Sequence, residues 1–170
     1  MTTDTNNFGN SVFPTTLEMA SQLLEAGVKR DDIISHIYHC HRVNRLRAMG
    51  YLLDNMEITP QGVAIVTLSQ KELSKFSLLE GETEGFVNLP LAIKKVRLSI
   101  FVKEAPDRLR VSLRSKKGTS ANQAAKEYFN GGGHILASGG RLSIGKEVES
   151  FDDVRPYIRK FSCEFFAPQK

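Results

Sequence analysis

The stretch VSLRSKKGTSANQAAKEYFNGGGHILASGG, residues 111–140, decides the fold of this chain. It continues a β-rich run, 109–114, in which apolar and polar side chains alternate, as they do on a strand with one buried face. Residues 119–129 then predict a helix with Thr119 or Ser120 as its N-cap. A glycine-rich loop follows, so a strand, a helix and a loop succeed one another within this one stretch.

Further strands and helices flank it on both sides. Residues 96–103 predict a strand that pairs with 109–114, because the intervening EAPDR has the composition of a hairpin turn. The other predicted elements are a strand at 63–68 after the turn ITPQG, a short helix at 70–76, a helix ending near Pro90 or Leu91, a short strand at 142–144 and a closing helix at 151–165. Together they predict an α/β domain with a mixed sheet.

The first 55 residues have a helical pattern instead. The predicted helices are one at 14–26 with Leu17, Ala20, Leu23 and Leu24 on one face, one opening at Asp31 or Asp32 that turns Ile33, Ile34 and Ile37 inward, and one at 43–53. We therefore place a domain boundary near Asn55, between a helical segment and the α/β domain.

The composition predicts a soluble, cytoplasmic protein. Charged residues make up 25% of the chain, and no apolar run approaches the roughly 18–20 residues of a membrane-spanning helix. MTTDTNNFGNS, at the N-terminus, lacks the basic start and apolar stretch of a secretory signal. Cys40 and Cys163 are too few for a disulfide scaffold, so we expect two reduced thiols and no contact with a membrane.

Positive charge is concentrated in one segment. Residues 91–146 carry 12 Lys and Arg against three acids, Glu104, Asp107 and Glu127, whereas the whole chain has a net charge of only +4. The segment is therefore +9 and the remainder −5. Such a concentration fits a phosphate-bearing ligand, and the alternative is a solvated face of mixed charges.

The glycine-rich loop is the sharpest candidate for a site. Gly131, Gly132, Gly133 and His134 precede Ala137, Ser138, Gly139 and Gly140. Glycines let backbone N–H groups approach an anion closely, and an imidazole beside them can donate a hydrogen bond to a phosphoryl oxygen. We expect loop amides, together with a helical turn starting near Ile135, to hold the anion. The alternative is a glycine connector with His134 packed beneath it.

Basic side chains also alternate along the strand before this loop. Arg110, Ser112, Arg114 and Lys116 project to one side if the segment is extended, and arginine suits bidentate recognition of phosphate. Arg114 and His134 would then converge on one ligand. The alternative is the exposed polar face of a half-buried strand.

One competing cluster has the residue types of a zinc site. His36, His39, Cys40 and His41 lie close together in sequence, with His36 and His39 or Cys40 on one helical face. No second Cys or His group completes a tetrahedral shell, and His41 points away from His36. We therefore favour a polar helix end over a metal site.

Three segments carry a family resemblance. Residues 111–140 resemble the DHH-associated domain of DHH-family phosphoesterases, in which an SLRS-type strand leads through a helix into GGGHxxAAG, with Ser138 here in place of the second alanine. TEGFVNLPLAI, residues 83–93, is similar to the oligoribonuclease and 3′-phosphoadenosine 5′-phosphate phosphatase type of this RecJ-like family. With TTDTNNF at the start, the resemblance covers essentially the whole chain.

The resemblance implies a domain division and a ligand set. Residues 1–55 would be the helical tail of a DHH catalytic domain plus a linker helix, and residues 56–170 the substrate-binding DHH-associated domain. The implied substrate contacts are Arg114, Ser115, Gly131, Gly132, Gly133, His134, Ala137, Ser138 and Gly139. Asp4 would be the last metal-binding aspartate, although taken alone it fits a turn or cap residue better than a metal ligand.

The family's D-x-D and DHH motifs are absent from the sequence. The resemblance therefore implies Mn²⁺ or Mg²⁺ in a full-length enzyme, no cofactor bound to this chain, and a missing DHH catalytic domain as its partner. The implied function is the phosphate-binding portion of a metal-dependent phosphoesterase that hydrolyses short oligonucleotides or nucleotide phosphates, inactive alone.

Two alternatives to this function stay open. An independent nucleic-acid-binding module is favoured by the basic segment and disfavoured by the scarcity of aromatics for base stacking. Part of an exopolyphosphatase-like enzyme is the other. The sequence leaves open the preference for RNA, DNA or a small nucleotide, and the oligomeric state.

Overall fold

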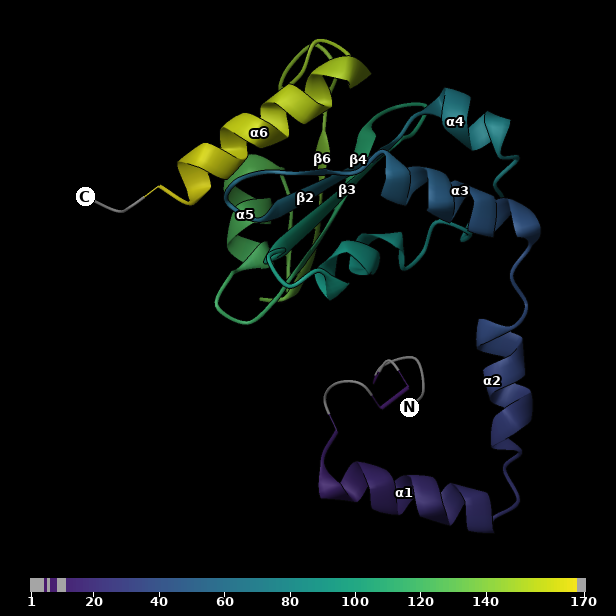
Figure 1. Ribbon diagram of the computed structural model, residues 1–170. Helices are drawn as coiled ribbons and strands as arrows, with labels where there is room; N and C mark the ends of the chain where they lie inside the picture. The colour runs from purple at the N-terminus through teal and green to yellow at the C-terminus, as the bar shows by residue number, and fades with distance from the viewer. Residues whose placement is uncertain (1–4, 6, 9–11, 168–170) are drawn as a thin grey trace. The chain divides into compact units, whose positions relative to one another are not determined.

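The computed structural model of the 170-residue chain describes residues 5, 7, 8 and 12–167 (Figure 1). Contacts divide the chain into two compact units, Met1–His41 and Arg42–Lys170. No helix among the described residues is both long and apolar enough to cross a membrane.

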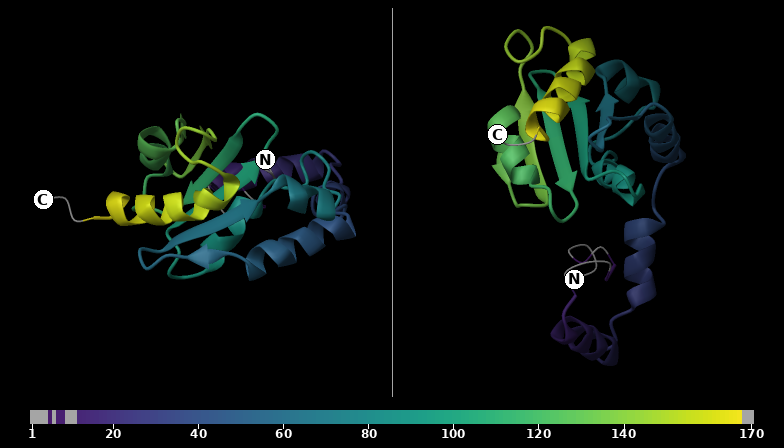
Figure 2. Two further views of the ribbon diagram at one scale, coloured as in Figure 1. Left: turned by 90° about the horizontal axis from the view of Figure 1, so that it is seen from above. Right: turned by 60° about the vertical axis from the view of Figure 1, so that its left-hand side comes forward.

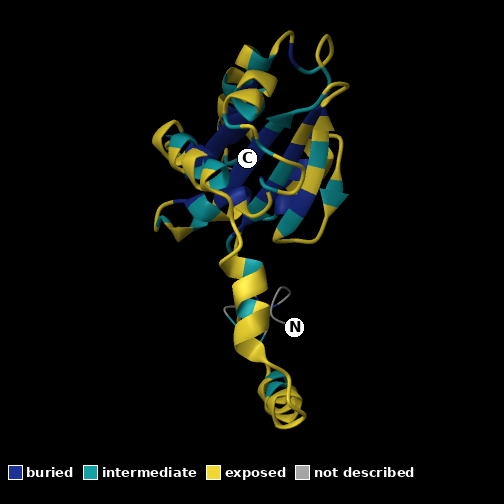
Figure 3. Ribbon diagram, turned by 90° about the vertical axis from the view of Figure 1, so that its right-hand side faces the viewer, coloured by how far each residue is buried: buried dark blue, intermediate teal, exposed yellow. Residues whose placement is uncertain are grey.

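The described part of the first unit contains two helices, α1 (Pro14–Glu25) and α2 (Arg30–Tyr38), as predicted. Their apolar faces line one hollow of about 610 Å³. The prediction that Ile33, Ile34 and Ile37 are turned inward is wrong for burial, because neither helix has a buried residue, Ile33 is 40% exposed, and Ile34 and Ile37 are only partly covered. Both helices are mostly exposed (Figure 3). Two short helices offer each other too little surface to cover both apolar stripes.

The second unit begins with α3 (Val43–Asp54), which packs on the sheet through Ala48 and Leu52. Contacts therefore group α3 with the sheet, and the division falls after His41 rather than near Asn55. The assignment of residues 1–55 to a catalytic domain and linker stays a prediction.

A six-stranded mixed sheet forms the centre of the second unit, in the order β1-β2-β3-β4-β6-β5. The strands are β1 (Glu57–Ile58), β2 (Val63–Leu68), β3 (Leu98–Glu104), β4 (Leu109–Ser115), β5 (Gly132–Gly133) and β6 (Ala137–Leu142). Only β2 and β3 pair in parallel; the other neighbours are antiparallel. The mixed α/β fold predicted from the sequence is confirmed.

The helices cover the two faces of this sheet unequally (Figure 2). The remaining ones are α4 (Gln70–Lys75), the 3₁₀ helices η1 (Phe86–Ala92) and η2 (Phe151–Asp153), α5 (Ala121–Tyr128) and α6 (Val154–Phe165). Both α5 and α6 pack against the larger hydrophobic cluster on one face. The smaller hydrophobic cluster lies on the other face and is formed by α3, η1, β2 and Phe101. It does not extend over β4 and β6, whose side chains on this face are mostly polar.

The glycine-rich segment departs from the prediction. Residues 132–142 form a β-hairpin, so the strand predicted at 142–144 begins instead at Ala137, and no helical turn starts at Ile135. Glycine, alanine and serine have low strand propensity, so the local sequence does not predict that these residues pair as strands. The hairpin lies beside β4, with Arg114 opposite Ala137 and Ser112 opposite Gly139.

An ion pair holds α6 against β1. Arg159 donates from Nε and Nη2 to the two carboxylate oxygens of Glu57, at 2.6 and 2.7 Å. These hydrogen bonds are the main reason that the pKa of Glu57 lies below its usual value. Thr59 and Ser162 add a buried hydroxyl contact of 2.8 Å nearby.

We expect Glu57→Gln to lower the free energy of unfolding by about 1 kcal/mol near neutral pH, the upper range for a partly exposed pair. A depressed carboxyl pKa contributes stability above the pKa of the unfolded chain, and this contribution is lost as the pH falls through the folded value. The difference between parent and variant should therefore shrink below about pH 4. Urea unfolding from pH 7 to pH 3.5 measures it.

The matched control is Glu149→Gln, at an exposed acid without an ion pair among the described residues. It should leave stability unchanged across the series. A cost of Glu57→Gln that stayed constant with pH would show that the carboxylate charge is not what matters.

Candidate anion-binding cleft

The β5–β6 hairpin presents the glycine–histidine motif at the edge of the sheet. The His134 N–H donates to the Ala137 carbonyl at 2.8 Å, and the Ala137 N–H donates back to the His134 carbonyl at 3.2 Å. These bonds close the turn at residues 134–137. His134 is therefore exposed at the end of the hairpin rather than packed beneath a connector.

Close backbone packing explains two of the glycines. A Cβ on Gly131 would overlap the Gly139 carbonyl oxygen and lie 2.5 Å from the Gly140 Cα. Gly133 has φ +146°, a conformation that residues with a Cβ rarely adopt. The motif thus has a structural requirement for glycine that is independent of any ligand.

Two backbone amides of this motif, those of Gly131 and Gly133, already have partners. The Gly131 N–H donates to the Ala125 carbonyl at 3.0 Å, and the Gly133 N–H donates to Asn122 Oδ1 at 3.2 Å. Two of the amides in the expected Gly131–Gly133 cradle are therefore engaged in this structure, and the cradle around an anion stays a prediction. Side chains on the neighbouring strand are the better candidates.

Strand β4 separates polar from apolar side chains as the sequence predicts. Leu109, Val111 and Leu113 are buried against the α5 and α6 face. Because side chains alternate along a strand, Arg110, Ser112 and Arg114 lie on the opposite face. On this face, α3 and η1 cover only part of the sheet, and the part formed by β4 is left uncovered.

A cleft of about 420 Å³ opens on that face. Its walls come from β3, β4 and the loop before η1. The lining residues of this basic cleft are Thr83, Glu84, Gly85, Val87, Phe101, Lys103, Arg110, Ser112 and Arg114.

Arg45 of α3 positions the loop that forms one wall. Its Nη2 donates to the Glu84 carbonyl oxygen at 2.8 Å, and its guanidinium lies 4.8 Å from the centre of the Phe86 ring. Gly85 adopts φ +81° and starts η1. Phe86 is buried in the smaller cluster, which fixes the loop against the sheet.

The charges of the basic cleft are unbalanced. Lys103, Arg110 and Arg114 line it together with one acid, Glu84, and none of the three cations forms an ion pair within the described part of the chain. Arg114 Nη1 donates to the Leu113 carbonyl at 2.9 Å, which leaves Nε and Nη2 without a hydrogen-bond acceptor among these residues. An anion would supply the missing acceptors.

His134 and Arg114 lie in one row across three backbone segments. Arg114 is the register partner of Ala137, and Ala137 is hydrogen-bonded to His134. His134 does not line the basic cleft itself. Their convergence on a single ligand therefore stays a prediction, with the row as its geometric basis.

Three predicted polar residues have structural partners instead. The Ser115 hydroxyl is buried on the opposite face and donates to the Thr119 carbonyl at 2.7 Å. Ser138 donates to the His134 carbonyl at 2.8 Å and stabilises the turn. Lys116 Nζ donates to the Ile93 carbonyl at 2.7 Å. We leave all three out of the proposed site, whereas Ala137 and Gly139 stay on the cleft face.

Sequence reasoning missed Lys103, Thr83 and Phe101. Lys103 belongs to the predicted strand 96–103, but only the register, which puts it opposite Arg110, shows that it shares the cleft face. Its Nζ donates to Thr83 Oγ1 at 3.4 Å. The excess of basic residues at 91–146 was the available signal.

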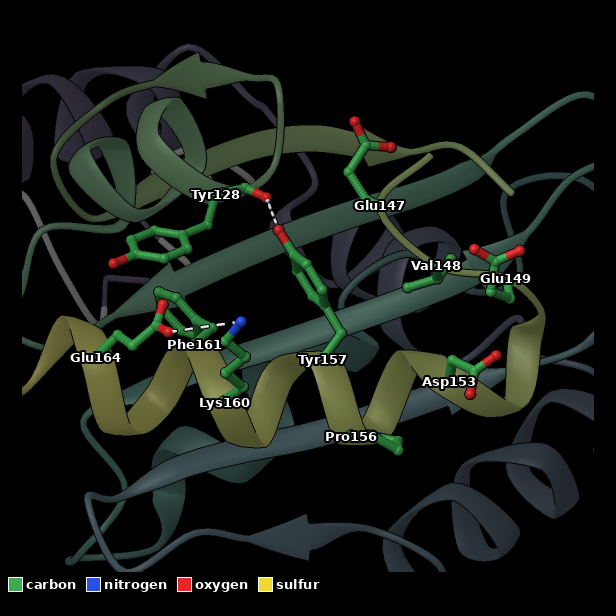
Figure 4. A pocket seen from close by; sticks show the side chains of 10 residues that line it. All are labelled: Tyr128, Glu147, Val148, Glu149, Asp153, Pro156, Tyr157, Lys160, Phe161 and Glu164. Atoms are coloured by element: carbon green, nitrogen blue, oxygen red, sulfur yellow. Dashed lines mark hydrogen bonds and ion pairs between the residues drawn. The ribbon is translucent and has the colours of Figure 1, made fainter. Parts of the chain in front are cut away.

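A second hollow lies beside α6 and has the opposite charge (Figure 4). It measures about 560 Å³ and is lined by four acids, Glu147, Glu149, Asp153 and Glu164, with Lys160 as the one cation. The Ser143 N–H donates to Glu147, which is the main reason that the pKa of this carboxyl is below its usual value. An anion would be repelled there.

The described residues contain no group of three or more His, Cys, Asp or Glu placed to hold a metal ion. His36 Nδ1 donates to the Asp32 carbonyl at 2.6 Å, so that nitrogen has a helical partner. Cys40 and Cys163 are free and exposed. Asp4 lies outside the described residues, so its predicted role as a metal ligand stays a prediction.

Comparison with known families decides the relationship. A model of the DHHA1 domain matches residues 61–160, more than half of the chain. The chain belongs to the DHHA1 domain family. The predicted resemblance to a DHH-associated domain is thereby confirmed, and the basic cleft and hairpin lie within the matched region.

The relatives that this chain matches are about twice as long as the chain, or longer. The chain is 37% identical over 121 residues to the "Probable bifunctional oligoribonuclease and PAP phosphatase NrnA" of Streptococcus mutans, covering 70% of this chain and 38% of the relative. Identity to the Bacillus subtilis "Bifunctional oligoribonuclease and PAP phosphatase NrnA" is 30% over 145 residues, covering 83% and 45%. The crystal structure of an exopolyphosphatase-related protein from Bacteroides fragilis matches with a TM-score of 0.88 and 36% identity, covering 97% and 48%.

We expect Gly131→Ala to lower the free energy of unfolding by about 2–3 kcal/mol, since the added methyl group overlaps backbone that cannot move without disrupting β6. Gly50→Ala is the control, because it lies in α3 with open space around its Cβ position. That change should stabilise by up to about 1 kcal/mol. Urea denaturation of both variants measures this, and an equal response would exclude backbone crowding as the reason for glycine at 131.

Proposed function

We propose that this DHHA1 domain binds the phosphate of a short oligonucleotide or nucleotide phosphate for a longer metal-dependent phosphoesterase. The observation that carries the proposal is the basic cleft, where Lys103, Arg110 and Arg114 face one hollow without ion pairs among the described residues. Arg114 offers two free guanidinium nitrogens, a geometry suited to bidentate contact with phosphate. His134, in the same row, would donate to a further phosphoryl oxygen.

The names of the relatives support this substrate class. Two of them are called oligoribonuclease and PAP phosphatase, and both words describe hydrolysis at phosphate groups of nucleotides. The chain spans less than half the length of each, so an activity of the whole protein would also require the remainder. A cytoplasmic location, a DHH catalytic domain as partner and assembly into an oligomer remain parts of the proposal.

The same proposal includes a divalent metal ion in the longer enzyme. Mn²⁺ or Mg²⁺ would be needed to activate water in a phosphoesterase of this kind. The described residues do not fit such a centre, because no cluster of carboxylates and imidazoles is present among them. The contribution that we assign to this chain is therefore binding and orientation of the substrate.

We expect Arg114→Gln and His134→Ala each to weaken binding of pApA, a 5′-phosphorylated diadenylate, by roughly tenfold or more, because each removes a charged or polar contact to phosphate. NMR titration of the 170-residue chain at fixed salt measures the affinity, which is salt-dependent. Arg108→Gln is the control, since Arg108 is exposed and paired with Asp107 at 2.6 Å. Unchanged affinity in both site variants, with intact folding, would refute the proposed site.

The chain by itself should show no manganese-dependent turnover of pApA, because the described residues offer no metal cluster. Product analysis after incubation with MnCl₂ tests this. A turnover that required manganese and was abolished by Asp4→Ala would contradict the assignment of this chain to binding alone.

A polyphosphate substrate is the second candidate, because the Bacteroides fragilis neighbour is described as exopolyphosphatase-related. Its binding would need the same cations but no nucleoside. Competition of inorganic tripolyphosphate against pApA separates the two. An independent nucleic-acid-binding module would instead show affinity that continued to rise with strands much longer than a few nucleotides.

A further inference from the structure

Three cations lie side by side across three strands at the far end of the basic cleft. Arg110 on β4 is the register partner of Lys103 on β3 and of Arg141 on β6. Side chains directly opposite each other project to the same face, so the three point away from the α5 and α6 core. We call Lys103, Arg110 and Arg141 the second cationic cluster.

Like charges in this position have an energetic cost. Cations directly opposite each other on neighbouring strands destabilise the pairing, and none of the three has an ion pair among the described residues. Of the two acids at this end of the hairpin, Glu104 accepts from the Gln70 N–H at 2.7 Å, and Asp107 is paired with Arg108 and attracts Arg110 more weakly. A bound anion would offset the repulsion among the three cations.

The spacing from Arg114 indicates what kind of anion fits. Arg110 and Arg114 are four residues apart on one strand, which corresponds to about 13 Å at about 3.3 Å per residue. A nucleotide has six backbone bonds against three for an amino acid, so an extended single strand advances roughly twice as far per unit, or about 6–7 Å. The two sites are therefore about two nucleotides apart.

The surface between the two sites leaves room for such a strand. Ser112 on β4 and its register partner Gly139 on β6 separate Arg110 from Arg114, and both are small. Ser112 and Phe101 line the cleft between the cations, so the path between the two sites stays open. A nucleoside bisphosphate, with its two phosphates on one nucleoside, would span only part of this distance.

We propose that the second cationic cluster binds a second phosphate, two nucleotides along from the phosphate at Arg114, so that the chain favours oligonucleotides of three or more residues over mononucleotides. This inference rests on the proposed function, because it takes Arg114 as the first phosphate contact. Arg110 is then a determinant of substrate length, and Arg114 is required for every length.

The test compares pA, pApA and pApApA on the parent chain and three variants, by NMR titration with EDTA present to prevent hydrolysis. Arg110→Gln should weaken pApApA about tenfold and weaken pA and pApA by a much smaller factor, because only the trinucleotide reaches both sites. Arg114→Gln should weaken all three ligands. Arg108→Gln, the exposed neighbour, should change none.

Salt dependence gives an independent readout. For single strands the slope of log affinity against log salt changes by about 0.7 for each phosphate contact. Arg110→Gln should therefore lower the slope for pApApA by about that amount and lower the slope for pA much less. A purely structural effect of the substitution would weaken all three ligands alike.

The outcomes separate this inference from the proposed function. If Arg114→Gln weakens binding but Arg110→Gln leaves pApApA unchanged, the second site is refuted and the first stands. If neither variant affects any ligand, or the parent chain binds none of them up to millimolar concentrations, both are refuted. Equal affinity of the parent for pApA and pApApA would also refute the second site.

Discussion

The antiparallel pairing of β3 with β4 places Leu98 opposite Ser115 and Glu104 opposite Leu109, and the polarity of the sheet depends on this register. It sets Ile100 beside Leu113 on one face and Lys103 beside Arg110 on the other. A slip of one residue would turn the cations into the hydrophobic cluster beneath α5 and α6. Burial of those apolar side chains therefore fixes the position of the cations, and the free energy that stabilises the fold also orders the candidate site.

The glycine-rich hairpin adds a second constraint. Gly131 and Gly140 let the end of α5 pass close to β6, and the Arg141 N–H donates to the Phe129 carbonyl at 2.7 Å across that contact. Glycine here serves backbone packing, while the exposed His134 is held at the turn that this packing closes. In this motif the glycines are required for packing, and His134 is the candidate for contact with a ligand. Substitution of the glycines would therefore act on His134 indirectly, by changing its position.

Much of the fold follows from local patterns. Alternation predicts which side chains of β4 share a face, and helical periodicity predicts α1, α3 and α6 close to their observed bounds. The β5–β6 hairpin was not predictable in this way, since its strands are built of residues with low strand propensity and pair with a neighbour that is distant in sequence. Lys103 was missed for a different reason: its strand was predicted, but only the observed register shows that it lies opposite Arg110 and shares its face.

Ser115 is a position where the family resemblance and the strand geometry disagree. Family resemblance assigned it to the substrate, yet alternation alone places adjacent residues on opposite faces, so Arg114 and Ser115 cannot both face the cleft. The buried Ser115 hydroxyl and its bond to the Thr119 carbonyl agree with the alternation. Strand geometry is the more reliable guide where the two conflict.

The distribution of charge then decides which face a polyanion approaches. Cations gather on the face of β3, β4 and β6 that is open, whereas the hollow beside α6 is lined by four acids and one lysine. A field of opposite sign on the two sides attracts phosphate to one and repels it from the other, before any specific contact forms. Because Arg110 and Arg114 follow one another along β4, the open face would also favour an extended ligand that lies parallel to this strand. An anion bound on the open face would thus lie along the row from Arg110 to Arg114.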